Sequence, residues 1–390
     1  MYKLEKIDTT VYIQTAGCVV PGIIDTFYRN NYNALYYYPE TYRHCSAVYG
    51  DQIKKSLADA GIVCATQFGT QGINLYKLMQ SVQEYPNTLF EIGLYEYFSL
   101  PNRFRKLLHN HKIVVHDYCE SARSSSRSMR SAIDTSNYAN ITDFYQHMID
   151  QHPNVILSTE SADHTWCLPT FLFKTVSANI ANNQIVQPTP NPSNDVLIPM
   201  WKPKRHRLDL LLSLHQNNLL HQCDWSLNEF NAHPDSQQSL ADSDILNTNR
   251  EHEFNMLYGE LLPRTLYSKS ESNLMGLPEQ SQWNYNLYIA SETDHSVALV
   301  TEKTYKGFIS GLPTLIHGGD QCAKIVTDMG FELVASTSSV TDICDLVENS
   351  KQYYDYELTK HNFYNIMDHE KMCGILSNQI LRMFDYFYNS

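Results

Sequence analysis

Apolar runs and turn residues alternate along the first half of the chain. Short apolar runs bounded by polar residues predict six strands, at 11–14, 34–38, 62–67, 89–94, 112–116 and 154–158. Longer segments between them, such as Gly50–Ala60 and Ile141–Gln151, predict helices. Strands that alternate with helices form parallel sheets covered by helices, so this half predicts an α/β domain.

A second run of alternating elements lies near the carboxyl end. Apolar residues predict a strand at Tyr285–Ala290 and another at Thr314–His317, with a helix between them and a further helix before a third strand from Phe331. Thr301 is a suitable N-cap for the first helix, and Gly311 is a suitable terminator. The sequence therefore predicts a β-α-β-α-β unit, which belongs to a parallel sheet.

Polar residues gather where this second sheet is expected to bind a ligand. In parallel sheets, ligands lie outside the carboxyl ends of the strands, where helix N-termini point. A carboxylate there can hold a ribose diol, and an ammonium group can neutralise a diphosphate. The glycine pair after the second strand either allows the backbone to approach a donor closely or makes a tight turn. The candidate nucleotide-binding residues are Glu292, Thr301, Glu302, Lys303, Gly318 and Gly319.

Basic residues precede another predicted helix. Leu208, Leu211, Leu212, His215 and Leu219 have the spacing of one buried helix face. Cations near a helix N-terminus oppose the helix dipole, so an anion such as a diphosphate is expected to compensate them. Arginine can grip phosphate with two nitrogens. The alternative is a solvated basic turn. The cations are Lys202, Lys204, Arg205 and Arg207.

Length and composition indicate two domains joined by a linker. The 390 residues are enough for two domains. The stretch 187–204 is rich in Pro, Asn and Ser and reads as a linker. We expect lobes at 1–190 and 205–350, joined by a linker at 191–204 and followed by a helical segment at 351–390.

Net charge and cysteine content bear on the partners and the cellular compartment of the protein. The net charge of −13 argues against a general nucleic-acid or anionic-membrane partner. No apolar run approaches the roughly 20 residues that span a bilayer, and the N-terminus has no secretory signal. The nine cysteines are odd in number and lack a Cys-x-x-Cys pair, so we expect reduced thiols in a cytoplasmic protein. If the protein is viral, the compartment would be the cytoplasm of the host.

The segment 287–333 resembles a known family. Thr301-Glu302-Lys303, a following aromatic residue, Gly311-Leu312-Pro313, an apolar strand and a glycine turn resemble the donor-binding segment of α1,3-fucosyltransferase-like glycosyltransferases. The segment is similar also to glycosyltransferase-like proteins of large viruses and phages. The resemblance implies the GT-B fold: two Rossmann-like α/β lobes with a C-terminal helix packing back on the first.

The resemblance also implies roles for individual residues. Glu302 would accept hydrogen bonds from ribose hydroxyls, and Lys303 would contact phosphate oxygens of a nucleoside-diphosphate sugar. Arg205 or Arg207 would contact the donor phosphate, and placement does not separate the two. Transfer to a glycan or other hydroxyl acceptor would be inverting and metal-independent, with no cofactor besides the donor.

Inverting transfer needs a base that deprotonates the acceptor hydroxyl. We expect this base in the first lobe, after the strand at 112–116, where Glu120 is the first candidate and Asp117 the second. Glu120-Ser121 resembles the Glu-Ser of the family, although Ala122 stands where Pro commonly follows. Glu160 is a third candidate. The alternative for each is a loop carboxylate that caps a helix or pairs with an arginine.

Other functions are less well supported by the motifs. Asp242-Ser-Asp244 resembles a metal-diphosphate motif but follows no apolar strand, and the 16 histidines show no zinc-ligand spacing. One alternative is a phage-type transferase that glycosylates hydroxymethylated DNA bases, which the negative charge disfavours. Another is a nucleotide- or glycan-binding protein without catalysis.

Overall fold

The computed structural model describes two compact units of the chain. The first comprises Met1–Ser177 with His369–Ser390, and the second comprises Ala178–Asp368. Within them, the residues described are 10–14, 34–36, 63–64, 88–93, 112–117, 146–147, 149–159, 166, 169–181, 185–200, 204–227, 284–292, 295, 299–319 and 321–389.

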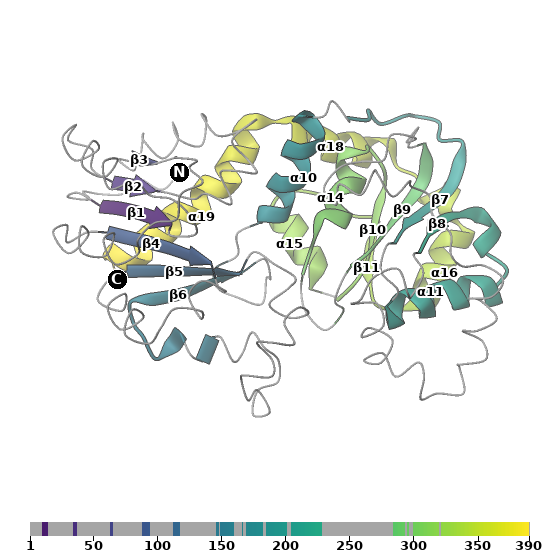
Figure 1. Cartoon of the computed structure of the whole chain (residues 1–390). Coiled ribbons are helices and arrows are strands. Elements are labelled where there is room, and N and C mark those ends of the chain that lie inside the picture. Colours follow the sequence, from purple (N-terminus) through teal and green to yellow (C-terminus); the bar gives the residue numbers. More distant parts are fainter. Residues whose placement is uncertain are drawn as a thin grey trace. The chain divides into compact units, whose positions relative to one another are not determined.

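The first unit contains a six-stranded sheet in which every neighbouring pair is parallel (Figure 1). Its strand order is β3-β2-β1-β4-β5-β6, an order found in doubly wound dinucleotide-binding domains. All six strands predicted from the apolar pattern are present, with ends shifted by a few residues. They are β1 (Thr10–Gln14), β2 (Ala34–Tyr36), β3 (Val63–Cys64), β4 (Thr88–Gly93), β5 (Lys112–Asp117) and β6 (Val155–Thr159).

Helices of the first unit include the C-terminal helix α19 (His369–Asn389). Phe387 of α19 is buried, and the Lys112 ammonium of β5 lies 5.5 Å from its ring centroid. Trp166 contacts the ring of Tyr386 edge-on, at 5.3 Å between centroids. The expectation that the C-terminal helix packs on the first lobe is therefore confirmed. The helix expected at 141–151 is helical at its described residues 146–147 and 149–150, and the one at 50–60 lies outside the described residues.

The second unit contains a five-stranded parallel sheet of order β11-β10-β9-β7-β8 (Figure 1). From β8 onward this is the 2-1-3-4-5 order of flavodoxin-like sheets. The direction in which strands are added reverses between β7 and β9. The strands are β7 (Asn194–Pro199), β8 (Cys223–Ser226), β9 (Tyr285–Ser291), β10 (Thr314–His317) and β11 (Ala335–Thr337). The predicted α/β class with two Rossmann-like lobes is confirmed.

Two expectations for the second unit are corrected by its sheet. The stretch expected to be a linker contains strand β7, because its apolar residues Val196, Leu197 and Ile198 are buried between β8 and β9. The third strand begins at Ala335 rather than Phe331. Phe331 instead stacks on Phe308, with 5.1 Å between ring centroids, and is 1% exposed. The chain reaches the sheet edge at Val334, whose amide donates to the Thr314 carbonyl of β10 at 2.9 Å.

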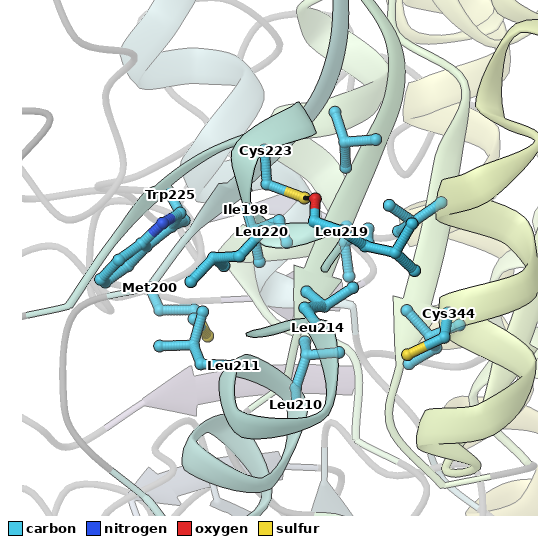
Figure 2. Packing of buried hydrophobic residues seen from close by; sticks show 14 of the residues in the cluster. Ile198, Met200, Leu210, Leu211, Leu214, Leu219, Leu220, Cys223, Trp225 and Cys344 are labelled. Atoms are coloured by element: carbon cyan, nitrogen blue, oxygen red, sulfur yellow. Dashed lines mark hydrogen bonds between the residues drawn. The ribbon is translucent and has the colours of Figure 1, made fainter. Parts of the chain in front are cut away.

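Helices surround the second sheet and share its core. The first, α11 (Arg205–Gln216), buries Leu208, Leu210, Leu211, Leu212 and Leu214, whereas His215 of the predicted apolar face is exposed. Figure 2 shows Leu210, Leu211 and Leu214 of this helix in the buried cluster that also contains Trp225 of β8 and Cys344. The other helices are η1 (Leu220–Gln222), α14 (Glu302–Ile309), α15 (Cys322–Asp328), α16 (Val340–Glu348), α17 (Ser350–Tyr353) and α18 (Tyr356–Met367), while α10 (Thr170–Ala181) spans the boundary of the two units.

The described cysteines and helices bear on two further expectations. Cys223, Cys322, Cys344 and Cys373 are buried thiols, in agreement with the expected core position of the cysteines. Among the helices that the structure describes, none is both long and apolar enough to cross a membrane.

Candidate functional site

The carboxyl end of β9 meets the start of α11 at the point where the strand order reverses. The Arg207 side chain is 2% exposed, and its Nη2 donates to the carbonyl oxygen of Ser291 at 2.9 Å and to that of Glu292 at 3.4 Å. His206 Nε2 donates to the same Glu292 carbonyl at 2.9 Å. The helix N-cap, Lys204, provides no side-chain cap. Positive side chains and the positive end of α11 therefore converge on the end of β9.

The structure separates the two arginines that the sequence left equivalent. Arg207 turns inward and holds the end of β9. The Arg205 side chain is 55% exposed and lies near Asp209, with 3.8 Å between Nε and Oδ2. An exposed pair at this spacing contributes little to stability, so Arg205 can leave Asp209 at small cost.

Glu292 joins this helix start to a second one. Its side chain is fully buried, and Oε1 accepts from the Thr301 amide at 3.0 Å and the Thr304 hydroxyl at 2.6 Å. Oε2 accepts from the Thr301 hydroxyl at 2.5 Å. Residue 292 thus contacts α11 through its carbonyl and α14 through its carboxylate. These contacts are those of a helix anchor, and direct contact of Glu292 with a donor stays a prediction.

The start of α14 carries an ion pair. Thr301 caps the helix as predicted, accepting from the Lys303 amide. Lys303 Nζ donates to Glu302 Oε1 at 2.9 Å and to Thr301 Oγ1 at 3.0 Å, and the side chains of Lys303 and Glu302 are only 15% and 10% exposed. An ammonium and a carboxylate are thus held side by side at a helix N-terminus, with the chemistry needed for a phosphate and a diol.

The glycine turn follows β10 beside Glu292. A Cβ on Gly318 would lie 3.2 Å from Ile316 Cγ2, which is a tight contact, and 3.4 Å from Glu292 Cβ. The carbonyl of Gly319 accepts from the Cys322 amide at 3.0 Å, which opens α15. These contacts agree with a tight turn that packs closely, and contact with a donor stays a prediction.

Three histidines that the sequence did not single out lie at the same place. The ring centroids of His206 and His295 are 3.9 Å apart, those of His295 and His317 are 4.3 Å apart, and those of His206 and His317 are 5.7 Å apart. His295 Nε2 donates to the His317 carbonyl at 3.0 Å, and His317 Nδ1 lies 3.1 Å from Ser291 Oγ. Their positions in the sequence show no ligand-like spacing, so only the fold reveals this histidine cluster.

Burial and neighbouring cations determine the charges of these groups. Burial lowers the pKa of His206 well below its ordinary value, and Arg207 lowers it further, so the ring is neutral at pH 7. Burial likewise lowers the pKa of His317. Burial raises the pKa of Glu292, against the opposing effect of the Lys303 charge. The site therefore combines the neutral imidazoles of His206 and His317 with the cationic side chain of Arg207.

The side chains of the remaining sequence candidates lie outside the described residues. Asp117 ends strand β5, and its side chain lies outside the described residues, as do Glu120, Glu160 and the Asp242–Asp244 motif. In the part of the chain that the structure describes, no group of three or more His, Cys, Asp or Glu residues has a geometry suited to holding a metal ion.

Comparison with known proteins gives distant likenesses only. No family model and no curated protein matches the chain. A glycosyltransferase from Rickettsia africae is 10% identical with a TM-score of 0.35, covering 98% of this chain and all of its own. The DNA-modifying enzyme β-glucosyltransferase is 10% identical with a TM-score of 0.42, over 97% and 99% of the two chains. The UDP-N-acetylglucosamine 2-epimerase of Rickettsia bellii is 14% identical with a TM-score of 0.33, over 99% of each. Because these TM-scores are below 0.5, conclusions about this chain rest on its own strand order and contacts.

Proposed function

We propose that the second unit binds a nucleoside-diphosphate sugar and that the protein is a glycosyltransferase. The observation that carries this proposal is the convergence of two helix N-termini on residue 292, at the reversal point of the second sheet. In open parallel sheets, the crevice outside this reversal point is where ligands bind. Helix N-termini favour anions there, and the donor's diphosphate is such an anion.

The charges in the site match the parts of such a donor. The Lys303 ammonium lies beside Glu302 and Thr301 at the start of α14, and in the proposal its positive charge attracts a phosphate oxygen. Glu302 accepts from ribose hydroxyls in the proposal. Arg205, which is exposed, supplies the phosphate fork, while Arg207 and Glu292 fix the strand and helix that carry these groups.

Catalysis in the proposal uses a carboxylate of the first unit. Glu120, or Asp117 as second choice, removes the proton of an acceptor hydroxyl while its oxygen attacks the anomeric carbon. The bond from that carbon to the diphosphate breaks, and the electron pair leaves with the nucleoside diphosphate. A single displacement inverts the anomeric configuration. The cationic groups at α11 and α14 stabilise the leaving diphosphate without a metal ion.

Donor binding is tested by thermal unfolding with GDP, UDP, ADP, CMP and dTDP, each with and without Mg²⁺. A nucleotide at 100 times its Kd stabilises the folded state by about 2.7 kcal/mol. We expect one selective, metal-independent response, lost in Lys303→Ala. Lys324→Ala is the matched control, because Lys324 is an exposed lysine of the same unit that pairs with Asp328. No response to any nucleotide by the folded protein would refute the proposal.

Transfer itself is tested with the sugar form of the nucleotide that binds. Glycan acceptors and hydroxymethylated duplex DNA are offered separately, and NMR of the product gives its anomeric configuration. We expect transfer to a glycan with inversion, and a large loss of turnover in Glu120→Gln with donor binding intact. Transfer to DNA alone would identify the other acceptor class. Binding without transfer or hydrolysis would identify a binding protein.

A further inference from the structure

The histidine cluster is linked to the proposed donor site through the atoms it contacts. His206 lies in the first turn of α11 and donates to the carbonyl of Glu292, the residue whose carboxylate anchors α14. His295 stacks on His206 and donates to the carbonyl of His317. His206 and His295 are half-buried, whereas His317 is fully buried at the base of the cluster.

The hydrogen bonds determine which nitrogen of each outer ring carries the proton. A carbonyl oxygen only accepts, so Nε2 of His206 and Nε2 of His295 must each bear hydrogen. In the neutral ring, Nδ1 then holds a lone pair. Neither ring can offer a second N–H to an anion until Nδ1 gains a proton. A hydrogen bond from His206 or His295 to an anion therefore requires proton uptake at Nδ1.

The described groups around His206 are cations and imidazoles. They are Lys204 at the N-cap of α11, Arg207 in α11, His295 in the loop after β9, and His317 in β10. Within the described residues, none of these groups is a carboxylate. At the base of the cluster, Nε2 of His317 is buried without a hydrogen-bond partner among the described residues. An anion is the ligand that such a set of cations, imidazoles and an unsatisfied ring nitrogen would bind.

We propose that the histidine cluster is a proton-accepting part of the donor site, in which His206 becomes an imidazolium when the diphosphate binds. This inference rests on the proposed function. The proton comes from solvent and adds to Nδ1 of His206, so the His206 ring is neutral in the free protein and cationic in the complex. The diphosphate is then held by charge that the empty site does not carry.

The proposal has a definite sign for pH. The cationic neighbours and burial keep the pKa of His206 low in the free protein, and the negative ligand raises it. A ligand that raises a pKa binds more tightly as the pH falls through the pKa of the complex. The affinity stops rising once the pH is below the pKa of the free protein. For one proton, the affinity gain is at most about tenfold per pH unit.

Calorimetry of the full-length protein tests this directly. The probe is the nucleoside-diphosphate sugar, whose phosphates are diesters without the second phosphate ionisation near pH 6. Titrations near pH 7 in buffers of different ionisation enthalpy give the number of protons taken up. We expect uptake approaching one proton in the wild type and tighter binding at lower pH. His206→Gln keeps a donor for the Glu292 carbonyl but cannot titrate, so uptake and pH dependence are lost.

A control and three outcomes complete the test. His215→Gln removes an exposed histidine of the same helix and should leave uptake unchanged. Binding without proton uptake by the wild type, which needs no variant, would overturn the inference and leave the proposed function standing. Undiminished uptake in His206→Gln would overturn it as well. Failure of every nucleotide and nucleotide sugar to bind would overturn both.

Discussion

The packing of α14 on the second sheet yields a quantitative prediction for Gly307→Ala. A Cβ at Gly307 would lie 2.3 Å from Thr314 Oγ1 and 2.7 Å from Tyr288 Cδ1. Neither neighbour yields easily: both residues are fully buried, the Thr314 hydroxyl donates to the Leu312 carbonyl at 3.0 Å, and the Tyr288 hydroxyl donates to the Lys303 carbonyl at 2.8 Å. The helix must therefore move away from the sheet, and Lys303 must move with it.

The magnitude follows from two opposing effects. Overpacking a core typically costs about 1–3 kcal/mol, and a separation of 2.3 Å favours the upper part of that range. Replacing a helical glycine by alanine recovers about 1 kcal/mol of helix propensity. The net expectation for Gly307→Ala is a loss of about 1–2 kcal/mol. Gly374 in α19 has no atom within 4 Å of an added Cβ, so Gly374→Ala should instead stabilise by up to about 1 kcal/mol.

Urea denaturation followed by circular dichroism measures both variants. The two units can unfold in separate transitions, so each midpoint is fitted by itself. Gly307→Ala should lower only the transition of the second unit, which carries α14, and should weaken nucleotide binding because Lys303 is displaced. Gly374→Ala should raise the other transition. A Gly307→Ala protein as stable as the wild type, or an equal loss in Gly374→Ala, would refute the packing argument.

Further predictions concern the buried charges of the second unit. Glu292→Ala leaves the Thr301 amide and two hydroxyls without their acceptor, so urea denaturation should show a loss of about 3 kcal/mol or more, with a smaller loss in Glu292→Gln. Because burial raises the pKa of Glu292, its contribution to stability is complete below the ordinary value of 4.5 and is lost as pH rises through the raised value. The wild type should therefore lose stability relative to Glu292→Gln as the pH rises above 4.5, and a constant difference would contradict this. Burial lowers the pKa of Lys306 from 10.5 to about 8, so stability should rise with pH between these values as the folded state releases a proton first. Lys306→Met should raise the urea midpoint at pH 7 and abolish that rise; an unchanged rise would show that another group causes it.

Local patterns in the sequence were sufficient to predict most elements. The six strands of the first sheet, strands β9 and β10, and the Thr301 cap of α14 all follow from apolar runs and from residues that begin or end helices. Such signals depend on neighbours a few positions away, and the burial of the described side chains in β5, β6, β9 and β10 agrees with them. The candidates at the start of α14 were found for the same reason, since cap, carboxylate and ammonium are adjacent in the chain.

Tertiary structure decided what depends on residues distant in sequence. The composition of the stretch around β7 resembles a linker, and only pairing with β8 and β9 makes it a strand. The sequence does not distinguish Arg205 from Arg207. In the folded helix Arg205 is exposed, whereas Arg207 is buried against β9. His206 reaches the carbonyl of Glu292 across 86 positions of sequence. The local periodicity of the sequence does not predict such a contact. The contact depends on the reversal of strand order between β7 and β9, which is set by how the strands pair.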